Sequence, residues 1–293
     1  MTSDTVPALS AAHGAHGTCD TPERHVSSDG IVWRRFGTGP PAILLHGSGG
    51  GWRHWVRNIA DIARRRTVIV PDLPGFGESA DINPDVSLED YAAVVAQALA
   101  PALGPRALID VIGFSFGSLV AAELARSMGA SVRSALLISL SGFAKPAGRV
   151  LGRRPRSAAA SLDAPQLREF HRQNLAASMF ACADAIDELA LDIQAEGFER
   201  SRFDNRALSR SAVMPWLLTQ LSCPIHLLFG AQDRMIHPFP AARAALCLEA
   251  RPDASVDLIE GGGHWIAYER AAETNRLIAR FLDDPRAGAA GAP

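Results

Sequence analysis

The chain has 293 residues, of which 47% are hydrophobic and 20% charged, a balance typical of a globular protein with a large core. The formal net charge of −2 gives no reason to expect nucleic acid or an anionic membrane as a partner. The four cysteines lie far apart without a Cys-x-x-Cys pair, which argues against a metal site or a disulfide framework. The N-terminus lacks a secretory signal pattern, and no apolar run reaches the roughly 18 residues of a membrane span. We therefore expect a cytoplasmic protein.

The beginning of the chain predicts a flexible arm followed by a hairpin. Residues 1–25 mix small and polar residues without periodicity, which favours a mobile N-terminal arm. Asp29-Gly30 is a common hairpin turn, and residues 31–36 form an apolar-rich stretch after it. These features predict a first pair of antiparallel strands.

From residue 42 onward, short apolar segments alternate with amphipathic helical patterns. The expected strands are Ala42–Leu45, Thr67–Val70, Ala107–Ile112, Ala135–Leu140, Ile225–Phe229 and Val256–Ile259. They lack polar alternation, as expected of parallel strands buried on both faces. Two segments show the apolar face of an amphipathic helix. One face is formed by Leu88, Tyr91, Val95 and Leu99, and the other by Leu277, Ile278, Phe281 and Leu282. This rhythm predicts an α/β fold with a doubly wound sheet, whose ligands bind outside the carboxyl ends of the strands.

One segment, residues 145–214, interrupts this rhythm and contains helical patterns without an apolar strand. Its apolar stripes are formed by Leu167, Phe170, Leu175 and Met179 and by Ile186, Leu189 and Ile193. We interpret the segment as a helical cap inserted into a core made of residues 26–144 and 215–283. Residues 284–293 are expected to form a loose tail.

A Gly-x-Ser-x-Gly sequence, residues 113–117, lies between an apolar run and a helical pattern. This context places Ser115 on a sharp strand-to-helix turn with its hydroxyl exposed, and the two glycines suit a turn that tolerates no Cβ. Serine is a poor nucleophile at neutral pH and needs a base that a carboxylate orients. Both partners should follow Ser115 in the order acid, then histidine, each after a strand. Asp233 and His264 meet these conditions, so we expect them to form a catalytic triad with Ser115.

Acyl chemistry also needs hydrogen-bond donors aimed at a developing oxyanion. The main-chain N–H of Phe116 is one candidate, and the glycine-rich loop of residues 46–51 offers a second. Ser48 is the preferred donor of that loop, with Gly49 as the alternative. The loop lacks the phosphate-binding Gly-x-x-x-x-Gly-Lys-Ser/Thr pattern, and no Gly-x-Gly-x-x-Gly turn opens a helix, so we expect no cofactor.

Five motifs in order resemble those of the α/β-hydrolase fold superfamily and span roughly residues 30–283. They are His46-Gly47, the Asp72–Ser79 loop, Gly113–Gly117, Gly230–Asp233 and Gly263–Trp265. The resemblance implies an eight-stranded, mostly parallel sheet with a helical cap after the sixth strand. It also implies Ser115 as nucleophile, Asp233 as acid and His264 as base, and Asp72 is expected to have a structural role.

The subfamily is less clear. Serine at position 115 argues against the haloalkane dehalogenases and epoxide hydrolases of this fold, which use aspartate there. His264-Trp265 together with Glu269 and Asn275 is similar to the meta-cleavage-product hydrolases, which cut C–C bonds of vinylogous diketones. However, those enzymes usually have a proline in the oxyanion loop, and the cap shows no match to their substrate-binding arginine. Carboxylesterase and lactonase activities remain equally open.

The sequence thus predicts a cofactor-independent serine hydrolase with a small-molecule substrate and no nucleic-acid or membrane partner. An acyltransferase and a non-catalytic small-molecule binding protein on the same fold are the alternatives, and a homodimer is possible. Aromatic and small residues near the motifs suggest a pocket for an apolar or aromatic acyl group. The expected lining residues are Gly47, Trp52, Trp55, Phe114, Phe116, Phe170, Met179 and Trp265.

Overall fold

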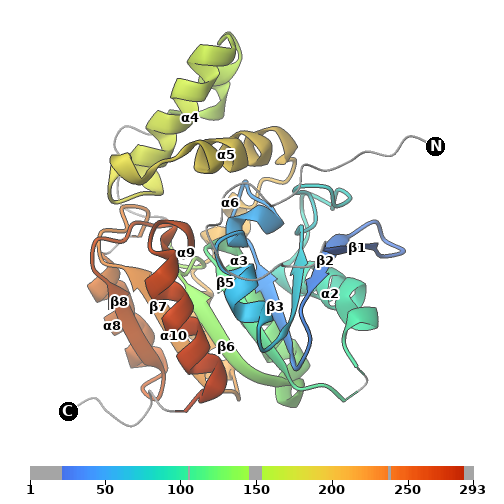
Figure 1. Ribbon diagram of the computed structural model, residues 1–293. Helices are drawn as coiled ribbons and strands as arrows, with labels where there is room; N and C mark the ends of the chain where they lie inside the picture. Colours follow the sequence, from blue (N-terminus) through green and yellow to red (C-terminus); the bar gives the residue numbers. More distant parts are fainter. Residues whose placement is uncertain (1–21, 105, 145–153, 237–238, 287–293) are drawn as a thin grey trace.

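An eight-stranded sheet forms the centre of the protein in the computed structural model, which describes residues 22–104, 106–144, 154–236 and 239–286 (Figure 1). The strand order is β1-β2-β4-β3-β5-β6-β7-β8, in which β1 and β2 are antiparallel to their neighbours and the other six are parallel. The strands are β1 Glu23–Val26, β2 Val32–Phe36, β3 Pro41–Leu45, β4 Thr67–Pro71, β5 Ile109–Phe114, β6 Val132–Ile138, β7 Ile225–Gly230 and β8 Ser255–Ile259. The predicted doubly wound, mostly parallel sheet is confirmed.

The hairpin at Asp29-Gly30 connects β1 and β2, and Gly30 adopts the positive φ of 75° that such turns favour. Strand β1 begins at Glu23, so residues 23–25 belong to the sheet rather than to an N-terminal arm. The predicted first pair of strands is present, but the expected arm extended over residues 23–25 because these residues of the edge strand are polar and carry no apolar signal. Residues 1–21 of the expected arm lie outside the described residues.

Strand β5 is displaced by two residues from its predicted position. Leu108 is 54% exposed and precedes the strand, whereas Gly113 and Phe114 continue it into the Gly-x-Ser-x-Gly motif. Gly113 lies opposite Leu45 of β3 and Leu137 of β6. Because the strand extends to the residue before Ser115, the turn starts directly at the carboxyl edge of the sheet.

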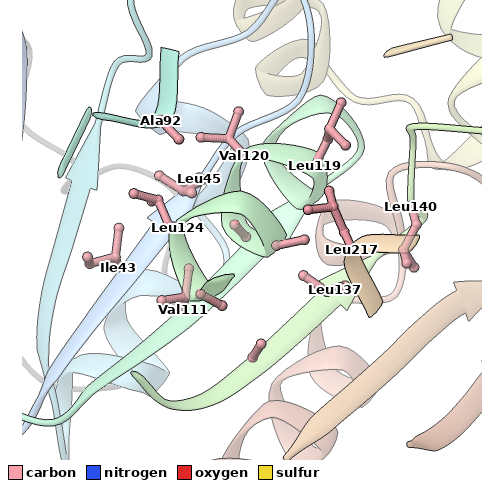
Figure 2. Packing of buried hydrophobic residues seen from close by; sticks show 14 of the residues in the cluster. Ile43, Leu45, Ala92, Val111, Leu119, Val120, Leu124, Leu137, Leu140 and Leu217 are labelled. Atoms are coloured by element: carbon pink, nitrogen blue, oxygen red, sulfur yellow. The ribbon is translucent and has the colours of Figure 1, made fainter. Parts of the chain in front are cut away.

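Helices cover both faces of the sheet, as expected for a doubly wound fold. The helices α2 Leu88–Leu99, α3 Phe116–Met128, α7 Met214–Gln220 and α8 Pro240–Ala250 share one hydrophobic cluster. The helices α1 Ile59–Ala63, α9 Ile266–Glu269 and α10 Ala271–Asp283 share the other. Figure 2 shows how Leu119, Val120 and Leu124 of α3 pack above Val111 of β5 and Leu137 of β6.

Three further helices, α4 Ala164–Ser178, α5 Glu188–Arg200 and α6 Arg206–Ser209, lie between β6 and β7 in the chain. A capping box formed by Asp163 and Gln166 starts α4. Helix α5 lies above the sheet (Figure 1), and the Cα of its Gly197 packs against Gly49 in the loop after β3. The segment therefore covers the carboxyl edge of the strands. Its division from the core at residues 145 and 214 stays a prediction, and residues 145–153 lie outside the described residues, as do residues 287–293 of the tail.

Among the residues that the structure describes, no helix is both long enough and apolar enough to cross a membrane. The cysteines that can be described, Cys182, Cys223 and Cys247, have free thiols.

A buried carboxylate joins four elements at the amino edge of the sheet. Asp110 of β5 is 1% exposed and accepts hydrogen bonds from Arg66, which precedes β4, and from Arg133 and Ser134 of β6. Both arginines also donate to the carbonyl oxygen of Leu282 in α10. Each charge of the cluster is therefore paired and hydrogen-bonded, which is the condition for burying a charge.

We predict that Asp110→Ala lowers the free energy of unfolding by roughly 3–5 kcal/mol, because it leaves the buried Arg66 and the partly buried Arg133 without their carboxylate. Asp283→Ala is the matched control, since it removes the exposed ion pair with Arg65 and should change stability by about 1 kcal/mol or less. Urea unfolding of both variants measures the difference. Equal effects of the two substitutions would contradict a structural role for the Asp110 cluster.

Candidate active site

The turn at Ser115 joins β5 directly to α3 and holds a non-glycine residue at a φ of 53°. A Cβ at Gly113 would lie 2.3 Å from the carbonyl oxygen of Gly117, and a Cβ at Gly117 would lie 2.2 Å from that of Leu45. Both contacts are impossible for a side chain, so glycine is required at both places, as the motif predicts. Half-buried Ser115 is therefore held at the carboxyl edge of the sheet by main-chain packing on either side.

Two hydroxyl groups hold the backbone of the turn. The carbonyl oxygen of Ser115 accepts hydrogen bonds from Ser118 Oγ at 2.5 Å and from Ser141 Oγ at 3.0 Å. The main-chain N–H of Ser115 donates to the carbonyl of Ile138 at the end of β6. These bonds satisfy polar groups that the strained turn would otherwise leave unpaired.

His264 lies between Ser115 and Asp233. Its Nε2 is 3.0 Å from Ser115 Oγ, and its Nδ1 is 2.7 Å from Asp233 Oδ2. A carboxylate only accepts, so Nδ1 carries the proton and Nε2 accepts from the serine hydroxyl. The other oxygen of Asp233 accepts the main-chain N–H of Met235, which fixes the carboxylate in place. The structure thus brings the three residues together in hydrogen-bond contact.

The loop after β3 lies against Ser115. A Cβ on Gly47 would be 3.2 Å from Ser115 Cβ and 2.9 Å from the Phe114 ring, so only glycine allows this close approach. Ser48 follows it and is exposed, and Gly49 has a φ of 65°. Phe116 is completely buried at the start of α3. Of the two expected oxyanion donors, Phe116 therefore directly follows Ser115, and Ser48 follows the glycine that packs against Ser115.

Two further histidines are buried beside this loop. His46 Nε2 accepts the N–H of Leu73 and its Nδ1 donates to Gly47 O, so the ring is neutral, and burial lowers its pKa. Burial lowers the pKa of His54 well below 6.5, and the nearby His46 and His264 lower it further. The His54 ring lies against Trp265 and Phe114, and its Nδ1 has no hydrogen-bond partner among the described residues.

The expected pocket residues are not all found at Ser115. Phe114 lies next to it and 5.1 Å from the His264 ring. Trp265 is buried between His54 and Tyr268, and its indole N–H donates to the His54 carbonyl. Two others have contacts elsewhere: Trp52 with Arg34 and Phe36, and Phe170 with His171 and Phe198. Met179 lies near His264, because its carbonyl accepts the main-chain N–H of Trp265. Trp55 is part of the core.

Asp72 accepts hydrogen bonds from the N–H groups of Trp52 and Glu78 and from Arg34, and it is 1% exposed. It therefore holds the loop of residues 72–79 against the loop after β3, which agrees with the structural role expected for it.

Two residues of the segment before α6 were missed by sequence reasoning. The Phe203 ring lies 6.4 Å from Phe116, and Asn205 Nδ2 lies 2.5 Å from Ser48 Oγ. No local pattern indicates them, because their partners are far away in the sequence. This segment therefore contacts both residues expected to supply oxyanion donors.

Glu269 was noted in the sequence for its resemblance to the meta-cleavage-product hydrolases, but its contacts were not predicted. Its carboxylate accepts main-chain N–H groups from Gly263 at 2.7 Å, Ala181 at 3.0 Å and Cys182 at 2.9 Å. Gly263 directly precedes His264, whereas Ala181 and Cys182 follow α4. The Glu269 side chain thus ties the His264 loop to the segment between α4 and α5.

Several known proteins are similar to this chain. A 2-hydroxy-6-oxo-6-phenylhexa-2,4-dienoate hydrolase of Burkholderia cepacia is 28% identical over 287 residues, which cover 89% of this chain and 93% of that protein. A 2-hydroxymuconate semialdehyde hydrolase of Pseudomonas sp. (strain CF600) is 36% identical over 118 residues, or 38% of this chain and 40% of that protein. The crystal structure of naproxen esterase from Bacillus subtilis has a TM-score of 0.71 at 20% identity, covers 90% of this chain and 91% of its own, and shares the fold.

The model of the alpha/beta hydrolase family matches residues 42–277, which is most of the chain. The match includes the Ser115 turn, the glycine-rich loop, Asp233 and His264. The expectation of an α/β-hydrolase enzyme is confirmed, and the chain belongs to the alpha/beta hydrolase family.

Proposed function

We propose that the protein is a serine hydrolase in which Ser115 attacks the carbonyl carbon of a small substrate. The observation that carries the proposal is the continuous chain of two hydrogen bonds from Ser115 Oγ through His264 to Asp233. A serine hydroxyl becomes a useful nucleophile only when such a base accepts its proton.

Each group then has a defined task. His264 Nε2 takes the hydroxyl proton as the Oγ–C bond forms, and Asp233 stabilises the resulting imidazolium. The main-chain N–H groups of Phe116 and Ser48 donate to the oxyanion. His264 passes its proton to the leaving group, and water then attacks the acyl-enzyme with His264 again as base, which releases the acid and restores Ser115.

His264 is favoured over the nearby His46 as the base because of its hydrogen bond to Ser115. Nε2 of His46 already accepts the Leu73 N–H, so it has no free lone pair for a substrate proton. Within the described residues, His264 is the histidine paired with a serine hydroxyl at the carboxyl edge of β5.

The surroundings of Ser115 favour a neutral, apolar ester as substrate. Gly47, Phe114 and Phe116 adjoin Ser115, and around them lie Ser48, His54, Phe203 and Asn205. None of these side chains carries a fixed positive charge that would pair with an anionic substrate. Apolar rings beside a few neutral polar groups suit an uncharged acyl group.

A second candidate is hydrolysis of the C–C bond in a ring-cleavage diketone. The specific support is the Burkholderia cepacia relative, whose name gives a dienoate hydrolase and whose similarity extends over nearly the full length of both chains. The same triad would serve both reactions, so the difference depends on the acyl pocket.

We predict that Ser115→Ala lowers kcat on any hydrolysed ester by several orders of magnitude without loss of folding, since it removes the nucleophile itself. Ser28→Ala, at an exposed position of the hairpin, should retain full activity. Ester hydrolysis and circular dichroism provide the measurements, and labelling with a fluorophosphonate probe reports the reactive serine. Near-normal turnover by Ser115→Ala would contradict the mechanism, whereas parent protein that neither turns over esters nor reacts with the probe would favour a binding protein.

The two candidate reactions are separated by their substrates. We expect kcat/KM on p-nitrophenyl esters of graded chain length to exceed that on a 2-hydroxy-6-oxo-dienoate, because no described neighbour of Ser115 compensates the dienoate charge. Steady-state kinetics on both series, with alcohols added as acyl acceptors, compares hydrolysis, C–C cleavage and acyl transfer. Faster dienoate cleavage would select the second candidate.

The buried histidines predict a loss of stability at acidic pH. His46 and His54 have pKa values below 6.5 in the folded protein, whereas the unfolded chain binds protons near 6.5. The free energy of unfolding should therefore be level above about pH 6.5 and fall below it, by up to about 1.4 kcal/mol per pH unit for each histidine. In urea unfolding, His54→Gln should show a shallower decline with pH than the parent. An equal slope would contradict the assigned neutral state of His54.

A further inference from the structure

The glycine-rich loop of residues 46–51, which would supply the second oxyanion donor, has almost no side chains of its own. Between His46 and Trp52, Ser48 is the only residue that is not glycine. Gly47 and Gly49 flank it, and Gly49 adopts a φ of 65° that glycine reaches without strain. Gly47 packs against Ser115 and Gly49 against Gly197, but Ser48 itself is exposed and its side chain adds little packing to the loop.

One side-chain hydrogen bond reaches this residue from outside the loop. Asn205 Nδ2 donates to Ser48 Oγ at 2.5 Å and to Ser209 Oγ at 3.1 Å. Asn205 is only 7% exposed. The bond therefore joins an exposed, glycine-flanked residue to a buried one.

Asn205 is itself well anchored. On one side, the N–H groups of Arg202 and Phe203 donate to the carbonyl of Gly75. On the other side, Ser209 N–H donates to Asn205 O, and Gly142 N–H, after β6, donates to Ser209 O. The segment of residues 202–209 is thus fixed to the core at both ends. Phe203 within it also packs against Phe116, the residue of the first proposed oxyanion donor.

We propose that Asn205 is a positioning residue that holds Ser48 through its hydroxyl and so orients the Ser48 main-chain N–H toward the oxyanion. The inference rests on the proposed function, because it concerns the second oxyanion donor of that mechanism. A preorganised donor stabilises the transition state more than the ground state, so its loss lowers kcat rather than substrate binding.

The test is a double-mutant cycle of Asn205→Ala and Ser48→Ala, measured on the best ester. Ser48→Ala keeps the main-chain N–H but removes the acceptor of the Asn205 bond. We expect each single substitution to lower kcat by roughly 10- to 100-fold with little change in KM. The double variant should be no slower than the slower single variant, since both remove the same bond. Ser211→Ala is the control, because this exposed hydroxyl of the same segment donates to Leu208 O and should leave kcat unchanged.

A trifluoromethyl ketone inhibitor adds a readout that a general structural defect would not reproduce. Ser115 Oγ adds to its carbonyl carbon, the hydroxyl proton passes to His264, and the carbonyl oxygen becomes an oxyanion. The inhibition constant should rise in Asn205→Ala and Ser48→Ala by about the same factor as kcat/KM falls.

The outcomes separate this inference from the mechanism on which it rests. If Ser115→Ala is inactive but Asn205→Ala behaves like Ser211→Ala, the positioning role is wrong and the serine mechanism stands. If the decrease in kcat of the double variant equals the product of the decreases in Asn205→Ala and Ser48→Ala, the positioning role is also wrong, because the two residues then act independently. Retained activity of Ser115→Ala would instead refute the proposed function. If Asn205→Ala shows no cooperative thermal unfolding, it is replaced in the cycle by Asn205→Leu. Leucine has a similar volume but makes no side-chain hydrogen bond.

Discussion

The close packing of α3 on β3 and β5 is the constraint on which the candidate site depends. Gly113 and Gly117 allow backbone to meet backbone where any Cβ would overlap a carbonyl oxygen. The chain can then turn within one residue, and Ser115 takes a φ of 53° at an energetic cost of order 1–3 kcal/mol. The buried face of α3, seen in Figure 2, offsets this strain because the helix cannot move without losing its contacts with the sheet.

The parallel sheet then brings the remaining groups to the same edge. Strands β5, β7 and β8 end beside Ser115, Asp233 and His264, and β6 lies between β5 and β7. Strand β6 contributes as well, because Ser139, which follows it at a φ of 48°, donates its hydroxyl to the carbonyl of His264. The geometry of the three side chains is therefore set by four adjacent strands rather than by any one loop.

Features that depend on local pattern could be predicted from the sequence. The core strands and the order of Ser115, Asp233 and His264 were visible because each residue follows its own apolar segment. Their catalytic role stays a prediction until it is tested. The expected N-terminal arm extended over residues 23–25 of β1 because these residues are polar, and the start of β5 was placed two residues early because Leu108 is apolar but exposed.

Features that depend on distant partners could not be predicted. Asn205 lies 157 residues from Ser48, and Glu269 lies 87 residues from Cys182, so no spacing rule connects either pair. Asp110 was visible only as a polar interruption in an apolar strand, since Arg66 and Arg133 meet it through the sheet. The contact of the Trp52 ring with Arg34 could not be predicted either, and its role as a pocket residue stays a prediction.

The carboxylate of Glu269 has a mechanical consequence for the molecule. It binds the peptide before His264 and the first peptides after α4 at the same time, with hydrogen bonds that its negative charge strengthens. If the segment after α4 moves away from the sheet, either these hydrogen bonds must break or the loop that carries His264 must move with it. The position of the segment after α4 and the alignment of His264 with Ser115 are thus coupled through one carboxylate.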